Sequence, residues 1–351
     1  MKIKAEPASN EDGLFTWYVH TFKLSKRNCV ILMNSASRFN IILYGLLAAD
    51  FSEFQDNVFT YIRKMLEHYH LSQEMIDAYL ENCGEVIFAK NTNRTDIARL
   101  NKVCTTLKEH YDVLQREIEQ NTLLQNALSE RINRYVIYKE DTIWHPNVHF
   151  FTLLKGKYQL PLYHFKMYRL KITLDFTDDE ISREILVPEF YTFQDLHLII
   201  QDCFNWENYH MYEFAIFKGE IVQMLIQPTM EDKFFEDFSF HEIPSLKDQE
   251  CTVDDIFSKE ETVIYTYDMG DNWQHEIKRM EVIPEYNSVI PTCLKVTGKA
   301  PPEDCGGTYG YIDFLKQIQQ GDEEMLAWAK SVKWKEQTFE KINRELKWHF
   351  G

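Results

Sequence analysis

Strand-like and helix-like patterns occupy separate stretches of this 351-residue sequence, and this separation constrains the fold more than any other feature. Clustered strands that do not alternate regularly with helices indicate an α+β class and exclude a doubly wound parallel sheet. The strand-like runs are residues 15–22, 29–33, 39–44, 86–89, 167–176, 184–187, 211–217, 220–226, 263–267 and 273–283. The length exceeds that of a usual single domain. We therefore expect two domains, each a small, mostly antiparallel sheet with helices packed on it.

A long helical segment is predicted to join these domains. From residue 103 to residue 135, apolar side chains recur at helical spacing without Gly or Pro, and the phase slips near Asn121. The pattern predicts one long helix or two helices end to end. A homodimer seam through residues 102–135 is an alternative, although its heptads are less regular than those of a sustained coiled coil. The expected boundaries are 1–101 for the first domain, 102–164 for a helical connector and irregular junction, and 165–351 for the second domain.

Local signals define several helix ends. Ser72 is placed to cap a helix that Gly84 would terminate. Thr192, with Asp195 three residues later, resembles a capping box at the start of another helix. Thr252 is placed to cap a short third helix, and helical spacing returns at residues 309–319, 323–332 and 337–347.

Composition limits where such a chain works. The longest apolar stretches fall far below the roughly 18 residues of a membrane-spanning helix, and the N-terminus lacks an apolar signal core. The seven cysteines are odd in number and include no CxxC pair, which favours reduced thiols over a disulfide framework. These features predict a cytoplasmic protein without a membrane segment.

Charge is distributed unevenly between the two halves. Residues 1–165 hold equal numbers of basic and acidic side chains, so the net charge of −17 arises entirely in residues 166–351. An acidic half of this kind repels nucleic-acid backbones and favours a basic protein partner. The acidic and aromatic run at residues 231–240 is one candidate docking loop. A nucleic acid, if bound, is expected to contact the first domain. The basic residues near its early strands are Lys23, Lys26, Arg27 and Arg38.

Residues 267–275 gather carboxylates, a histidine and a glycine at a predicted hairpin. Because side chains alternate along a strand, Asp271, Trp273 and His275 would share one face, with Asp268 across the turn. A histidine with two carboxylates can bind a divalent metal or act as an acid–base pair. Asp268, Asp271 and His275 are therefore the candidate catalytic residues.

Further residues could complete a metal site if the chain brings them together. The candidate ligands of a divalent metal, the one cofactor considered, are His197, His210, Asp271, His275, Asp304 and Cys305.

Each of these residues also has an ordinary structural interpretation. Asp268 and Asp271 are typical turn residues, and Asp304 is placed to cap the following helix. His197 lies beside an apolar helix face, as a hydrogen-bonded core histidine would. No general base is identifiable beside Cys305, which argues against a cysteine nucleophile. Gly306 and Gly307 suit a turn in which two backbones approach closely.

The second half resembles the plasmid pRiA4b ORF-3-like family, a bacterial and archaeal group also described as an insertion-element passenger protein. The matching residues are Leu196, His197, Trp206, His210, Tyr267, Asp268, Gly270, Asp271, Trp273, His275, Pro301, Pro302, Glu303, Asp304, Cys305, Gly306, Gly307, Gly310 and Tyr311. The resemblance implies an α+β domain and a link to mobile elements and plasmids, and it assigns no activity. One departure is at residues 179–184, which keep a single arginine of the family's Trp-Arg-Arg segment.

The first half is similar to a small bacterial domain of unknown function. The similarity is carried by Trp17, His20, Arg38, Phe39, Asn93, Arg94, Leu100 and Asn101.

These observations lead to three hypotheses for the function of the whole chain. The leading hypothesis is a non-catalytic binding or interaction protein associated with mobile elements. The alternatives are a metal-assisted hydrolase that uses Asp268, Asp271 and His275, and a nucleic-acid accessory protein.

Overall fold

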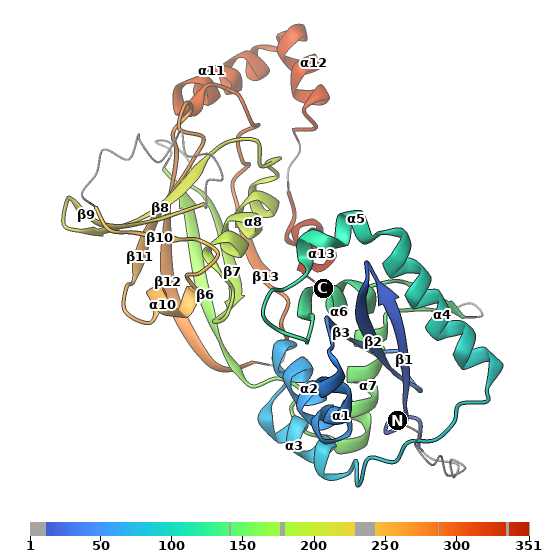
Figure 1. Ribbon diagram of the computed structural model, residues 1–351. Coiled ribbons are helices and arrows are strands. Elements are labelled where there is room, and N and C mark those ends of the chain that lie inside the picture. The colour runs from blue at the N-terminus through green and yellow to red at the C-terminus, as the bar shows by residue number, and fades with distance from the viewer. Residues whose placement is uncertain are drawn as a thin grey trace. The chain divides into compact units, whose positions relative to one another are not determined.

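The computed structural model describes residues 12–139, 142–175, 180–228, 243–286, 288–334 and 337–350. The chain divides into two compact units, Met1–His164 and Phe165–Gly351. Each unit combines a mostly antiparallel sheet with helices, so the predicted α+β class is confirmed (Figure 1). Among the described residues, none of the helices has both the length and the apolar content of a membrane span. The acidic and aromatic run at residues 231–240 lies outside the described residues.

The first unit is built on a three-stranded antiparallel sheet with the order β1-β2-β3. Its strands are β1 (Trp17–Leu24), β2 (Arg27–Asn34) and β3 (Asn40–Tyr44), all three of which the sequence predicts. Alternate residues of β2 enter different clusters: Val30 and Leu32 join one, and Cys29, Ile31 and Met33 join the other. The sheet is therefore covered on both faces, which explains why β2 and β3 are almost wholly apolar.

Helices cover both faces of this sheet. The first cluster includes α2 (Phe54–His68), α3 (Gln73–Glu81) and α7 (Pro146–Tyr158), and the second includes α4 (Arg94–Glu109) and α6 (Asn126–Asn133). Ser72 caps α3 as predicted, because its side chain accepts a hydrogen bond from Met75 N. The shorter elements of the unit are α1 (Ala48–Ser52), α5 (Tyr111–Leu114), a 3₁₀ turn (Gln115–Glu117), β4 (Ile137–Lys139) and β5 (Thr142–Trp144).

The predicted long helical connector is wrong. Helix α4 ends at Glu109, and only short helical elements follow before a turn at Asn121, whose φ is 62°. The phase slip in the sequence marks this break. Leu107, Leu128 and Ile132 pack with the sheet of the first unit, so their apolar surface is not available as a dimer seam. Residues 102–164 thus belong to the first unit.

The predicted strand at residues 86–89 is also absent from this described part of the chain. Val86 and Phe88 instead pack against the core from an irregular loop, and the side-chain amide of Gln55 donates to the Val86 carbonyl. The apolar residues are used for packing, and no neighbouring strand pairs with them.

The second unit contains an eight-stranded sheet with the order β10-β9-β8-β11-β12-β6-β7-β13. The strands are β6 (Phe165–Leu174), β7 (Ile181–Pro188), β8 (Tyr212–Lys218), β9 (Ile221–Gln227), β10 (Ser245–Lys247), β11 (Thr262–Tyr267), β12 (Trp273–Tyr286) and β13 (Thr292–Thr297). All neighbours are antiparallel except β9 and β10. The two strands of this sheet that the sequence did not reveal, β10 and β13, form its edges.

Helix α8 (Phe193–Phe204) lies along this sheet (Figure 1). Thr192 and Asp195 form the predicted capping box, and Leu196, Ile199 and Cys203 point into the core. The other helices are α10 (Val253–Phe257), α11 (Gly307–Gln320), α12 (Glu323–Ser331) and α13 (Phe339–Phe350).

Candidate functional site

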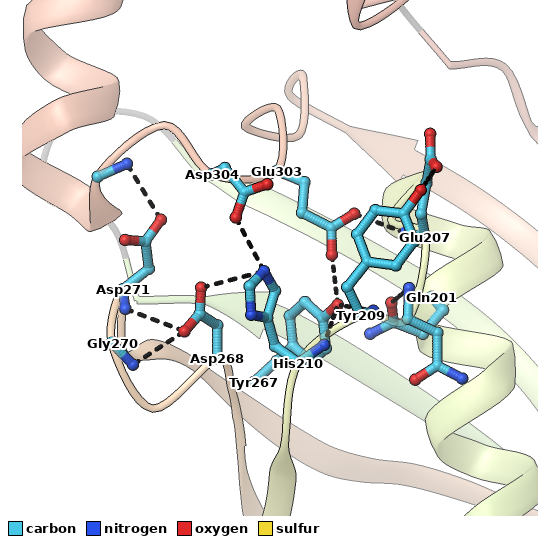
Figure 2. A network of polar contacts seen from close by, with 12 residues as sticks. Gln201, Glu207, Tyr209, His210, Tyr267, Asp268, Gly270, Asp271, Glu303 and Asp304 are labelled. Carbon is cyan, nitrogen blue, oxygen red and sulfur yellow. Dashed lines mark hydrogen bonds and ion pairs between the residues drawn. The ribbon is translucent and has the colours of Figure 1, made fainter.

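Three loops of the second unit meet at one end of its sheet (Figure 2). Strands β11 and β8 pair so that Tyr267 lies opposite Tyr212, which brings the start of β8 beside the β11–β12 turn. There the Asp268 N–H donates to the Met211 carbonyl at 2.9 Å. From the other side, the Gly306 N–H donates to Asp271 Oδ2 at 3.0 Å. The turn therefore holds both the loop before β8 and the loop before α11.

His210 lies between two carboxylates in this arrangement (Figure 2). Its Nε2 is 2.8 Å from Asp304 Oδ1 and 3.6 Å from Asp268 Oδ2. One donor atom from each of the three residues lies within 4.8 Å of the others. Metal–ligand bonds of about 2.0–2.2 Å in a tetrahedral site separate neighbouring ligand atoms by about 3.3–3.5 Å. Small shifts of the side chains would therefore let the three donors share one ion.

Asp268 is held in a fixed orientation. Its φ is 55°, and its Oδ1 accepts from the Gly270 N–H at 2.8 Å and from the Asp271 N–H at 3.3 Å. This is the local hydrogen bonding that favours Asp in turns. It occupies one carboxylate oxygen and leaves Oδ2 facing His210. Such support orients ligating carboxylates in metal sites.

Glycines allow the loop before α11 to reach the turn. Gly306 and Gly307 have φ values of 89° and 66°, and a Cβ on Gly307 would lie 2.5 Å from the Asp271 carbonyl oxygen. Gly306 occupies the N-cap position of α11 without a side-chain cap. The alternative interpretation, in which Asp304 caps this helix, is therefore wrong. The Asp304 carboxylate pairs with His210 instead.

A second set of polar contacts lies beside His210 (Figure 2). The Tyr267 hydroxyl donates to Glu303 and accepts from the Tyr209 N–H at 3.1 Å. The other Glu303 oxygen accepts from the Glu207 N–H at 2.6 Å, and the Tyr209 hydroxyl donates to Glu207. Burial, together with the hydrogen bond to Glu303, raises the pKa of Tyr267. The hydrogen bond to Glu207 raises the pKa of Tyr209.

His275 is not part of the site, so its prediction as a ligand and catalytic residue is wrong. It is fully buried, and neither ring nitrogen has a hydrogen-bond partner within the described structure. Its ring packs among Phe204, Trp206 and Tyr265. Burial lowers its pKa to about 3. The reason is that alternation along β12 places Trp273 and His275 together on the face that packs into the core.

His197 is a core histidine too, and its prediction as a metal ligand is wrong. Its Nδ1 lies 2.8 Å from the Tyr265 hydroxyl and its Nε2 lies 2.7 Å from Asn208 Oδ1. The ring stacks on Tyr212 with 3.5 Å between centroids. Burial lowers the pKa of His197 to about 4, which keeps the ring neutral.

The remaining candidates flank the cluster without joining it. Asp271 uses its carboxylate to hold Gly306. Cys305 is partly buried, and burial raises its pKa to about 12, so it stays a thiol. Of the predicted ligands, the described residues bring His210 and Asp304 together, and Asp268 completes the group. The sequence did not indicate Glu207 or Tyr209, because contacts between distant loops set their roles.

The fold and this cluster define a two-unit α+β protein whose second unit carries a histidine and two carboxylates at one end of its sheet. Residues 166–343 match the family model "Plasmid pRiA4b ORF-3-like protein", and the chain belongs to this family. Residues 1–148 match the model "Domain of unknown function (DUF6933)".

Two relatives each match slightly less than half of the chain. The uncharacterized protein y4hQ of Sinorhizobium fredii (strain NBRC 101917 / NGR234) is 29% identical over 179 residues, which are 46% of this chain and 80% of that protein. The crystal structure of the protein of unknown function MM3350 from Methanosarcina mazei Go1 is 30% identical, with a TM-score of 0.40, and covers 47% of this chain and 89% of its own. Neither relative has an assigned activity in its name.

Proposed function

We propose that this protein is a cation-binding protein whose second unit binds a divalent metal ion through His210, Asp268 and Asp304. The observation that carries the proposal is the convergence of three donor atoms, from three separate loops, within 4.8 Å of one another. The net charge of −17, which arises in this half of the sequence, also favours a cation.

The donor set indicates the kind of ion. One imidazole nitrogen and two carboxylate oxygens suit first-row transition metals such as Zn²⁺ or Mn²⁺. Three protein ligands leave at least one coordination position for water or for a group on a bound partner. A histidine binds a metal through the lone pair of an unprotonated ring nitrogen, so an ion bound at Nε2 would take the place of the direct contact between Nε2 and Asp304.

The test is metal titration of the full chain after treatment with a chelator, followed by calorimetry and elemental analysis. We expect one ion per chain. Asp268→Asn and His210→Ala each remove one ligand and should weaken metal binding at least about tenfold, because mutation of a residue that only orients a ligand already has an effect of this size.

Asp271→Asn is the matched control. Asp271 lies in the same turn but contacts Gly306 rather than His210, and an asparagine oxygen can still accept that hydrogen bond. Equal metal affinity in the wild type, Asp268→Asn and His210→Ala would show that the three residues form only an ion-pair network. Loss of binding in Asp271→Asn alone would point to a different site.

Metal-assisted hydrolysis is a second candidate function. Its metal ligands would be Asp268, His210 and Asp304, whereas the sequence hypothesis used Asp268, Asp271 and His275. A pocket of about 240 Å³ that includes Asp304 among its lining residues favours it, because a substrate there would lie beside the open coordination position. A hydrolase screen with Zn²⁺- or Mn²⁺-loaded protein tests it, and activity that survives in His210→Ala would reject this site.

The role in the cell that we propose is recognition of a basic partner, without catalysis. The surplus negative charge of the second half supports this role. The link to plasmids or mobile elements is supported by the family description alone. Capture of a partner whose affinity falls steeply with added salt would agree with this role.

A further inference from the structure

A pocket of about 240 Å³ lies beside the metal-binding cluster, between the loop after α8, the loop before α11 and the segment after α12. Residues that define its character are Phe204, Glu207, Tyr209, Glu303, Asp304 and Trp334. Pockets for drug-sized ligands occupy about 300–1,000 Å³. This pocket is smaller, so it suits one compact group or a single side chain.

The walls of the pocket are strongly acidic. Glu207, Glu303 and Asp304 line it, and no lysine or arginine occurs among its described lining residues. Glu303 accepts from the Tyr267 hydroxyl and a backbone N–H, and Glu207 accepts from the Tyr209 hydroxyl. These neutral donors orient the carboxylates without cancelling their charge. A positively charged ligand would therefore find two oriented anionic partners.

The other lining residues include apolar side chains as well as polar Asn205, Ser331 and Gln337. Phe204, Pro301 and Trp334 contribute apolar walls that a hydrated metal ion or a phosphate would not fill. Lys299 occupies one face of the Trp334 ring, with its Nζ 3.0 Å from the centroid, so a ligand would contact the part of the ring that lines the pocket. An acidic rim over apolar walls matches an aliphatic stem that ends in a charged head.

Cationic side chains lie near the pocket without lining it: Lys299 is at the ring of Trp334, the Nζ of Lys341 donates to Asn205 Oδ1 at 3.1 Å, and Arg183 is buried behind Phe204. Arg183 contacts the ring of Phe204, and its N–H groups donate to main-chain carbonyls such as those of Cys203 and Thr297. Arg183 is fully buried and is absent from the lining residues. It therefore cannot neutralise Glu207 or Glu303 by direct contact.

We propose that this pocket binds an aliphatic ammonium or guanidinium group, with Glu207 and Glu303 as its charge partners and Trp334 packed against its stem. The inference rests on the proposed recognition of a basic partner, not on the metal site, and names the chemical class of the group that is recognised. Two sources supply this chemistry: a free amine such as spermidine, or a lysine or arginine side chain of a basic protein segment.

The test is calorimetric titration of the full chain with spermidine, putrescine, and lysine and arginine blocked as N-acetyl amides. N-acetylcitrulline amide is the uncharged counterpart of blocked arginine. We expect a cation to bind saturably, and citrulline to bind at least about tenfold more weakly, because it lacks the charge-assisted hydrogen bonds. Tighter binding of the free amines identifies a small-molecule ligand, and tighter binding of the blocked amino acids identifies a partner side chain.

Glu207→Gln should weaken the binding of the best cation at least about tenfold, because the substitution removes one charge partner and keeps the size of the side chain. Glu207 is exposed, so the fold should survive the substitution. Glu260→Gln is the matched control, since Glu260 is exposed and does not line the pocket. Failure of every cation to saturate, equal binding of arginine and citrulline, or unchanged binding in Glu207→Gln would each overturn the proposal.

A further pair of variants separates this inference from metal binding. Asp268→Asn removes a proposed metal ligand that does not line the pocket, so it should lose the ion and keep the amine. Glu207→Gln should lose the amine and keep the ion. If no metal binds to the wild type and the amine still does, the pocket proposal stands without the metal proposal.

Discussion

His210 and Asp304 lie 94 residues apart in the chain, yet Nε2 of the histidine is 2.8 Å from Oδ1 of the aspartate. Two interactions bring these residues together. Pairing of β8 with β11 places His210 beside the β11–β12 turn, and the hydrogen bond from Gly306 to Asp271 brings the loop with Asp304 to the same turn. The cluster therefore depends on how closely two backbones can approach.

Gly307→Ala is expected to destabilise the second unit. Its φ of 66° costs an alanine about 1–2 kcal/mol, and a Cβ 2.5 Å from the Asp271 carbonyl oxygen would add about 1–3 kcal/mol of overpacking. Gly321→Ala is the control, because its φ is 76° but nothing lies within 4 Å of the added Cβ. Urea unfolding of both variants measures the difference, and equal losses would show that the close approach is unimportant.

Buried neutral His275 should make the protein less stable in acid. Its pKa is about 3 in the folded state and about 6.5 when unfolded, so below pH ~6.5 the unfolded chain takes up the proton first. Over the window between these values, its contribution lowers the unfolding free energy by about 1.4 kcal/mol for each pH unit of acidification.

His275→Leu should remove this contribution. Between pH 7.5 and pH 5 the variant should lose about 2 kcal/mol less stability than the wild type, as urea midpoints at the two pH values would show. His164→Gln, at an exposed position, should behave like the wild type. Identical pH dependence in His275→Leu and the wild type would mean that the imidazole reaches water before unfolding.

The capping box at Thr192 and the hairpin between β11 and β12 were predictable from the sequence, because nearby residues determine them. The alternation along β12 also predicted correctly that Trp273 and His275 share a face. It did not reveal that this face packs into the core, because that depends on Phe204 and Tyr265, which come from other elements.

The approach of His210 to Asp268 and Asp304 could not be predicted for the same reason. No local pattern links the loop before β8 to the loop before α11. The long connector was wrong for a different reason. The spacing from residue 103 to residue 135 is helical over most of its length, but the slip at Asn121 marks a turn rather than an irregular heptad. The apolar residues on both sides of it then pack against one sheet.

Arg183 is the single arginine retained in residues 179–184, and it should be essential for the stability of the second unit. It is fully buried, and its N–H groups donate to carbonyls of Cys203, Thr297 and Gly298. Arg183→Met would remove the donor from each of these buried carbonyls and should cost about 3 kcal/mol or more. Arg183→Lys keeps the charge but cannot reproduce the planar fork, so it should cost about 1–3 kcal/mol.

Arg169→Met is the control for this pair, because Arg169 lies on the same sheet but is partly exposed and paired with Glu184. A surface ion pair of this kind contributes about 0–1 kcal/mol. Chemical unfolding of the three variants gives the ranking. A loss in Arg183→Met no larger than that in Arg169→Met would mean that water replaces the guanidinium.

Tyr267→Phe should weaken both the fold and the acidic pocket. The tyrosine hydroxyl donates to Glu303 and accepts from the Tyr209 N–H, so its removal leaves a carboxylate and a backbone donor without a shared partner. The expected loss is about 1–3 kcal/mol in unfolding free energy.

Tyr267→Phe should also weaken ligand binding. Glu303 loses the donor that orients it, so spermidine or blocked arginine should bind to this variant more weakly than to the wild type. Tyr309→Phe is the matched control, because Tyr309 is 88% exposed. An unchanged affinity together with lower stability would assign Tyr267 to folding alone and leave Glu207 as the main charge partner.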